Sequence, residues 1–143
     1  MTQNKHLLGW IDEMAEMTQP DKIVWIDGTE EQAEQLRAEA CSTGEMIKLN
    51  QDLLPNCYHH RTAITDVARV EDRRFLCTPT KEDAGNANNW MDPAEMYAKL
   101  SKLYDGSMAG RTMYVIPYSM GPVGSPFSKI GVELTDSIYV VLN

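Results

Sequence analysis

Four arginines fall within one short segment of the chain, residues 61–74, which reads RTAITDVARVEDRR. Arginine binds carboxylates and phosphates through paired hydrogen bonds, each contributing about 1.5–3 kcal/mol where water is excluded. The segment also contains three acidic residues, and exposed ion pairs contribute only about 0–1 kcal/mol. The charge pattern therefore leaves open both an anion site and a set of surface ion pairs. The residues are Arg61, Arg69, Arg73 and Arg74, with Asp66, Glu71 and Asp72 among them.

A second candidate is the glycine-rich stretch GPVGSP at 121–126. A phosphate-binding loop of the G-x-x-x-x-G-K-[ST] type surrounds phosphates with backbone N–H groups and a lysine. This stretch lacks the lysine, and Pro122 and Pro126 each remove a backbone donor. The pattern predicts a structural turn.

Ser119 is a weak candidate for a nucleophile. A nucleophile elbow, G-x-S-x-G, needs glycine on both sides of the serine because the turn is tight. Pro117 stands at the first glycine position, and no histidine and acid are marked as its partners. The pattern does not predict a serine hydrolase.

Cys57, His59 and His60 are of the types that bind metal ions. Neighbouring residues of a strand point to opposite faces, so the two histidines are poorly placed to chelate one ion. No second ligand pair at zinc-like spacing occurs. We interpret them as half-exposed polar residues on a loop or strand.

Composition narrows the function classes. The net charge is −8 and the sequence pI about 4.8, which argues against binding to nucleic acid or to an anionic membrane. Three widely spaced cysteines (Cys41, Cys57 and Cys77) suggest no disulfide framework. We find neither a secretory signal nor an apolar run long enough for a membrane span. A soluble cytoplasmic protein is expected.

Hydrophobic periodicity predicts the elements that position these residues. Helical spacing of apolar residues, with Thr29 and Asp92 as N-caps, indicates helices over 4–18, 29–40 and 92–104. Apolar β-branched runs indicate strands over 23–26, 74–78, 111–118, 129–134 and 137–142, with a polar loop over 81–91. The last helix is expected to bury Met96, Tyr97, Leu100, Leu103 and Tyr104. The predicted fold is α/β (mixed α+β), a mixed sheet with flanking helices in one domain over 1–143.

Several stretches together resemble one family. They are QPDKIVWIDGTEEQAEQL (19–36), DVARVE (66–71), NNWMDPAEM (88–96), GRTMYVIPYSMGPVGSP (110–126) and SKIGVELTDSIYVV (128–141). In order and spacing they are similar to the N-terminal domain of GTP-dependent phosphoenolpyruvate carboxykinase. The resemblance covers nearly the whole chain from about residue 8.

The resemblance implies a decarboxylating lyase of gluconeogenesis. Such an enzyme converts oxaloacetate and GTP to phosphoenolpyruvate, GDP and carbon dioxide, with manganese at the active site and magnesium on the nucleotide. Residues 1–143 would be the substrate-side domain, and the C-terminal nucleotide- and metal-binding domain would lie in sequence beyond residue 143. We expect the chain to be inactive by itself and to bind no cofactor specifically.

The resemblance also assigns two residues. Arg69, which closes DVAR, would bind the carboxylate of oxaloacetate or phosphoenolpyruvate. Glu71 would lie in the loop that meets a closing lid, while Arg61, Arg73 and Arg74 keep the interpretation as surface ion pairs. The stretch 110–126 would pack against the C-terminal domain.

Two alternatives to an enzyme domain remain at this stage: a non-catalytic anion-binding module that uses Arg69, and a structural or assembly domain. The apolar run at 138–142 would expose strand edges that favour self-association.

Overall fold

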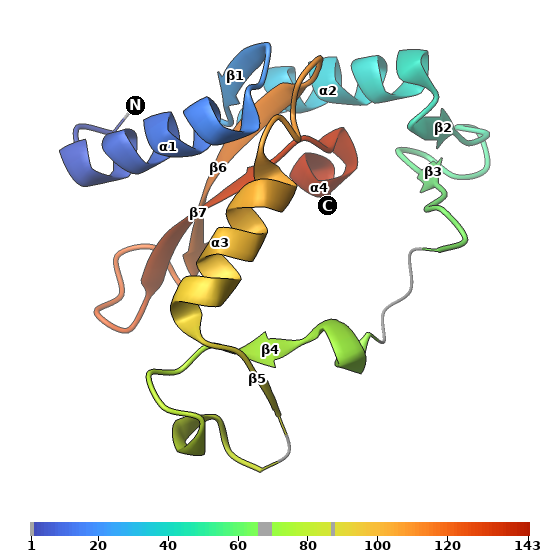
Figure 1. The fold of residues 1–143 in the computed structure, drawn as a ribbon. Coiled ribbons are helices and arrows are strands. Elements are labelled where there is room, and N and C mark those ends of the chain that lie inside the picture. The colour runs from blue at the N-terminus through green and yellow to red at the C-terminus, as the bar shows by residue number, and fades with distance from the viewer. Residues whose placement is uncertain (1, 66–69, 87) are drawn as a thin grey trace.

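The computed structural model describes residues 2–65, 70–86 and 88–143 (Figure 1). The helices are α1 (Lys5–Thr18), α2 (Glu30–Thr43), α3 (Pro93–Tyr104) and α4 (Ile138–Leu142). The strands are β1 (Lys22–Trp25), β2 (Met46–Lys48), β3 (Tyr58–His60), β4 (Phe75–Leu76), β5 (Asn89–Trp90), β6 (Thr112–Met120) and β7 (Lys129–Thr135). Two 3-10 turns, Glu71–Arg73 and Glu82–Ala84, complete the described elements.

A three-stranded mixed sheet with the order β1-β6-β7 organises the chain. Strand β1 runs parallel to β6, with Ile23 opposite Met113, and β7 runs antiparallel to β6. Two short strand pairs, β2 with β3 and β4 with β5, lie outside this sheet. The mixed α/β class predicted from the sequence is confirmed.

The first half of the central strand β6 is buried on both faces, at Met113, Tyr114 and Val115. On one face Tyr114 packs against Leu36 and Ala40 of α2 and Ile138 of α4. The neighbouring Met113, which points to the opposite face, lines a hollow together with α1 residues such as Met14. A strand covered on both faces is apolar without alternation, which explains the run Met113-Tyr114-Val115.

Burial of Tyr114 predicts a loss of stability at alkaline pH. Burial, and then the negative charges of Glu39 and Glu45, raise the pKa of the Tyr114 phenol above its ordinary value. A folded state that disfavours the phenolate binds more protons than the unfolded state above about pH 10, where a free tyrosine ionises. The free energy of unfolding therefore keeps the full contribution of this phenol below pH 10 and loses it as pH rises through the raised pKa. We expect Tyr114→Phe to flatten urea-unfolding free energies measured from pH 9 to 11; an unchanged slope would contradict this.

The strand predicted over 137–142 is wrong, because Ile138–Leu142 form the helix α4. Ser137 caps this helix, since its hydroxyl accepts a hydrogen bond from Val140 N at 3.4 Å. Burial of Ile138 against α2 then favours the helix over the β propensity of the run. The predicted strand edge does not exist at this place.

The burial predicted for helix α3 is also wrong. None of its residues is buried, and Tyr97 and Leu103 are 75% and 66% exposed. The stripe is apolar as predicted, but among the helices α3 packs mainly against α1. Its apolar side is left largely open.

No helix in the described part of the chain is long and apolar enough to cross a membrane.

Candidate functional site

Arg69 and the residues 66–68 before it lie outside the described residues. The structure does describe the turn that follows Arg69. Val70 leads into the 3-10 turn Glu71–Arg73, in which Arg73 N donates to Val70 O at 2.9 Å and Arg74 N donates to Glu71 O at 3.3 Å. The side chains of the turn are exposed, including that of Glu71.

One side chain from a distant segment holds this turn. The amide nitrogen Nδ2 of Asn89 donates to Glu71 O at 2.8 Å and to Arg74 O at 3.1 Å. Asn89 is also the strand partner of Phe75, which lies two residues after the turn. Sequence reasoning missed Asn89, because an asparagine in a polar loop gives no signal of a contact 15 to 18 residues away.

The short β4–β5 pair connects the turn to helix α3. It replaces the middle of the predicted strand 74–78 and the end of the predicted loop 81–91. The indole N–H of Trp90 donates to Thr78 O at 3.0 Å, and Met91 N donates to Leu76 O at 3.3 Å. Asp92 then caps α3 by accepting hydrogen bonds from Ala94 N and Glu95 N, as predicted. Figure 1 shows the β4–β5 pair at the end of α3, away from the three-stranded sheet.

The surface ion pairs predicted for Arg61, Arg73 and Arg74 are not found among residues that the structure describes. The ion pairs there join Arg37 to Glu30 and Glu34, and Arg111 to Asp136. Arg61, Arg73 and Arg74 are all exposed. Glu71 and Asp72 of the turn equal Arg73 and Arg74 in number, but neither forms an ion pair with them among the described contacts.

The two histidines of β3 point to different environments, as predicted. His59 is exposed, whereas the ring of His60 stacks on Tyr139 with 4.1 Å between centroids. His60 Nδ1 also donates to Glu45 O at 2.7 Å. Within the described ranges no three histidine, cysteine or acidic residues come together as metal ligands, and Cys57 is a free thiol.

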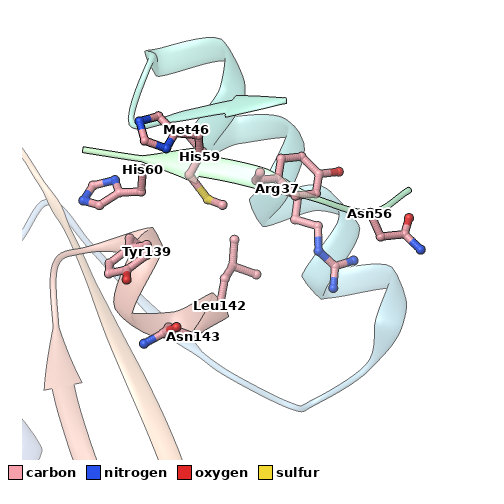
Figure 2. A pocket seen from close by; sticks show the side chains of 9 residues that line it. Arg37, Met46, Asn56, His59, His60, Tyr139, Leu142 and Asn143 are labelled. Carbon is pink, nitrogen blue, oxygen red and sulfur yellow. The ribbon is translucent and has the colours of Figure 1, made fainter. Parts of the chain in front are cut away.

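A polar hollow of about 490 Å³ lies between the β2–β3 pair and α4. Figure 2 shows Tyr139 and Leu142 of α4 facing the two strands across it. Arg37 lines the hollow, but it binds Glu30 and Glu34 at 2.6 and 2.5 Å, and these hydrogen bonds raise the pKa of its guanidinium. Because both carboxylates already neutralise this arginine, the hollow is a poor anion site.

Glu45 ties this region together and was not anticipated from the sequence. Its carboxylate accepts hydrogen bonds from Ser137 Oγ at 2.9 Å and from Tyr139 N at 3.0 Å. The same residue accepts from His60 through its carbonyl. These bonds fix α4 to the β2–β3 pair, which is a structural role.

The glycine-rich stretch forms the turn between β6 and β7, as predicted. Gly121 and Gly124 have φ values of 106° and 86°, which side-chain-bearing residues rarely adopt. Ser119 lies within β6, and its hydroxyl donates to Gly121 O at 3.0 Å. This placement differs from the strand-to-helix turn of a nucleophile elbow.

Residues of this turn and its strands form an apolar arm, defined as Tyr118, Met120, Val123, Phe127 and Ile130. Val123 and Phe127 at its tip are 88% and 89% exposed. By the strand register, Ile130 lies opposite Ser119, on the other face from Tyr118 and Met120, so the arm exposes apolar side chains on both of its faces. Single exposed apolar residues are ordinary, but so many on one hairpin are typical of an interaction surface.

A family model described as the phosphoenolpyruvate carboxykinase N-terminal domain matches residues 9–143. The chain therefore belongs to the family of phosphoenolpyruvate carboxykinase N-terminal domains.

Its curated relatives point to the GTP-dependent enzymes. The phosphoenolpyruvate carboxykinase (GTP) of Anaeromyxobacter sp. (strain K) is 54% identical over 142 residues, which cover 99% of this chain and 24% of the relative. The enzyme of the same name from Renibacterium salmoninarum is 51% identical over 140 residues, covering 98% and 23%. That from Corynebacterium kroppenstedtii is 49% identical over 142 residues, covering 99% and 23%. The chain thus spans about a quarter of the length of these relatives.

Proposed function

We propose that this chain is the substrate-side domain of a cytoplasmic enzyme that converts oxaloacetate and GTP to phosphoenolpyruvate, GDP and carbon dioxide. The observation that carries the proposal is the family match over residues 9–143, together with relatives named as the GTP-dependent enzyme. The chain by itself lacks most of the length of those relatives, so we expect it to have no turnover alone.

In this proposal Arg69 binds the substrate carboxylate. A guanidinium matches a carboxylate with two parallel hydrogen bonds, which fix both position and orientation. Loss of carbon dioxide from oxaloacetate leaves an enolate, whose oxygen attacks the γ-phosphorus of GTP while the bond to the leaving GDP breaks. Phosphoryl transfer asks a protein mainly for positioning and charge stabilisation, and Arg69 would supply the positioning. Glu71, exposed on the turn after Arg69, would contact a closing lid.

GTP, with its magnesium, and manganese would bind outside this chain. The described residues contain no cluster suited to a metal ion, and the glycine-rich turn contributes Pro122 and Pro126 where a phosphate loop needs N–H donors. We therefore assign nucleotide and metal binding to the remaining three quarters of the relatives' length.

We propose that the remaining three quarters of the relatives' length also covers the apolar arm and the open side of α3. Both surfaces are apolar and exposed, with Phe127 89% and Tyr97 75% accessible. Beyond the matched region, the relatives carry about three times the length of this chain, which is enough to cover both surfaces. Self-association through the edge strands β1 and β7 is the competing outcome.

Calorimetric titration with oxalate and phosphoenolpyruvate tests the role of Arg69. We expect the chain to bind both anions weakly, and Arg69→Ala to lower the affinity about 10- to 100-fold, since a hydrogen bond to a charged group contributes about 1.5–3 kcal/mol. Arg61→Ala is the matched control, because it removes an exposed arginine of the same segment. Equal affinity of the parent and Arg69→Ala, or no binding by the parent, would contradict a carboxylate site within this chain.

A further inference from the structure

The hydrogen bonds of β6 show which backbone groups of β7 face away from the sheet. Ile26 N donates to Val115 O at 2.9 Å, so the N–H and C=O groups of Val115 face β1. Successive residues of a strand face alternate neighbours, so those groups of Tyr114, and of every second residue after it, face β7. Their ladder partners are the odd-numbered residues of β7 from Lys129 to Thr135. The residues between these partners have N–H and C=O groups that face outward; they are Ile130, Val132 and Leu134.

The outward groups of β7 form an open strand edge. Within residues 2–65, 70–86 and 88–143, no backbone partner is found for Ile130, Val132 or Leu134. Strand β7 is seven residues long, lies at one edge of the sheet, contains no proline and pairs with β6 without a bulge. An edge of this kind is a template on which another strand can pair.

The opposite edge of the same sheet is largely blocked. Strand β1 has four residues, and Gln32 Nε2 donates to Trp25 O at 2.9 Å at its end. Beyond the end of β1, the open side of β6 includes Pro117, which has no N–H group to donate. Proline on an edge is a common protection against unwanted pairing. Of the two edges, β7 is therefore the one that can accept a strand.

The side chains of β7 define the kind of strand that fits beside it. On the face of the sheet that carries α1, β7 presents Ile130, Val132 and Leu134, which line apolar hollows next to that helix. The opposite face presents Lys129 and Glu133. Since neighbouring side chains of a sheet pair across strands, the fitting strand alternates apolar with polar residues. It would place an acidic residue beside Lys129 and a basic residue beside Glu133.

We propose that the edge of β7 pairs with a β-strand from the remaining three quarters of the polypeptide. The proposal rests on the proposed function, which makes this chain one domain of a longer enzyme. The matched residues are 24% of the Anaeromyxobacter sp. (strain K) relative, so the rest is long enough to supply the strand. A second copy of this chain is a poorer partner, because two chains of net charge −8 repel each other. The edge also adjoins the apolar arm at Ile130, so the added strand would continue the docking surface proposed there.

Hydrogen exchange at single amides, read by fragmentation mass spectrometry, tests this pairing. It compares the 143-residue chain with a chimera in which this chain replaces the matched 142 residues of the Anaeromyxobacter sp. (strain K) relative. The amides of Ile130, Val132 and Leu134 should exchange rapidly in the chain alone and at least about 100-fold more slowly in the chimera. The amides of Gly131 and Glu133 are internal controls, because they face β6 and should be protected in both.

The outcomes separate this inference from the proposed function. Rapid exchange of the three amides in a chimera whose Gly131 and Glu133 are protected would refute the inference, even if the chimera turns over. Protection without turnover would support the inference and contradict the proposed function. Protection that appears in the chain alone and grows with its concentration would assign the edge to a second copy and overturn the inference. If the chimera does not fold, the natural relative decides, since rapid exchange at its three matched positions would equally overturn it.

Discussion

Met113→Ala is expected to lower the free energy of unfolding by about 2–5 kcal/mol. Met113 is fully buried in the central strand β6, and it lines the hollow between the sheet and α1. Alanine would leave a cavity there that a strand held between β1 and β7 cannot collapse to fill. Urea unfolding followed by circular dichroism measures the loss.

Met120→Ala is the matched control, because Met120 lies on the same strand but is 67% exposed. We expect it to change stability by no more than about 0.5 kcal/mol. Similar losses in the two variants would show that the core does not lie where the structure places it.

The double substitution Val123→Asp with Phe127→Asp is expected to abolish the docking proposed for the arm and to leave the fold intact. Both side chains are almost fully exposed at the tip of the apolar arm, so the charges are solvated while the chain is alone. In a complex the same charges would be buried without partners, which lowers affinity by roughly 100-fold or more. The partner for the measurement is the Anaeromyxobacter sp. (strain K) relative produced without its matched 142 residues, with complex formation followed by sedimentation.

Leu53→Asp provides the comparison for the arm. Leu53 is 77% exposed and lies in the loop between β2 and β3, outside both proposed docking surfaces. It should leave complex formation unchanged. Undiminished binding of the arm variant would remove the arm from the interface, and equal loss in both variants would mean that added charge alone prevents docking.

Local patterns predicted most of the main elements. Helices α1, α2 and α3 and strands β1, β6 and β7 follow from apolar spacing and from caps such as Thr29 and Asp92, because those signals are contained within each element. Their boundaries shift by one to three residues where the end is set by packing or by a turn.

Elements decided by distant contacts were mispredicted. The run at 138–142 has β-branched residues, yet Glu45 and α2 hold it as a helix from nearly a hundred residues away. The stripe of α3 has the right period for burial, but periodicity cannot tell whether a covering element exists within the same chain.

The candidate site was also only partly predictable from the sequence. The charge pattern of 61–74 could not separate an anion site from surface ion pairs, and only the family resemblance selected Arg69. Arg69 lies outside the described residues, so its role remains a proposal. Asn89 was not predictable, because its two hydrogen bonds depend on the pairing of β4 with β5.

The most direct test exchanges this chain for the matched 142 residues of the Anaeromyxobacter sp. (strain K) relative, to which it is 54% identical. Formation of phosphoenolpyruvate and GDP from oxaloacetate and GTP, with manganese and magnesium supplied, is then measured in the chimera and in its Arg69→Ala variant. A substrate-side domain predicts turnover in the chimera and its loss in the variant. A chimera that folds and binds GTP but shows no turnover, or whose turnover survives Arg69→Ala, would contradict the account; the first result would favour an anion-binding or structural domain.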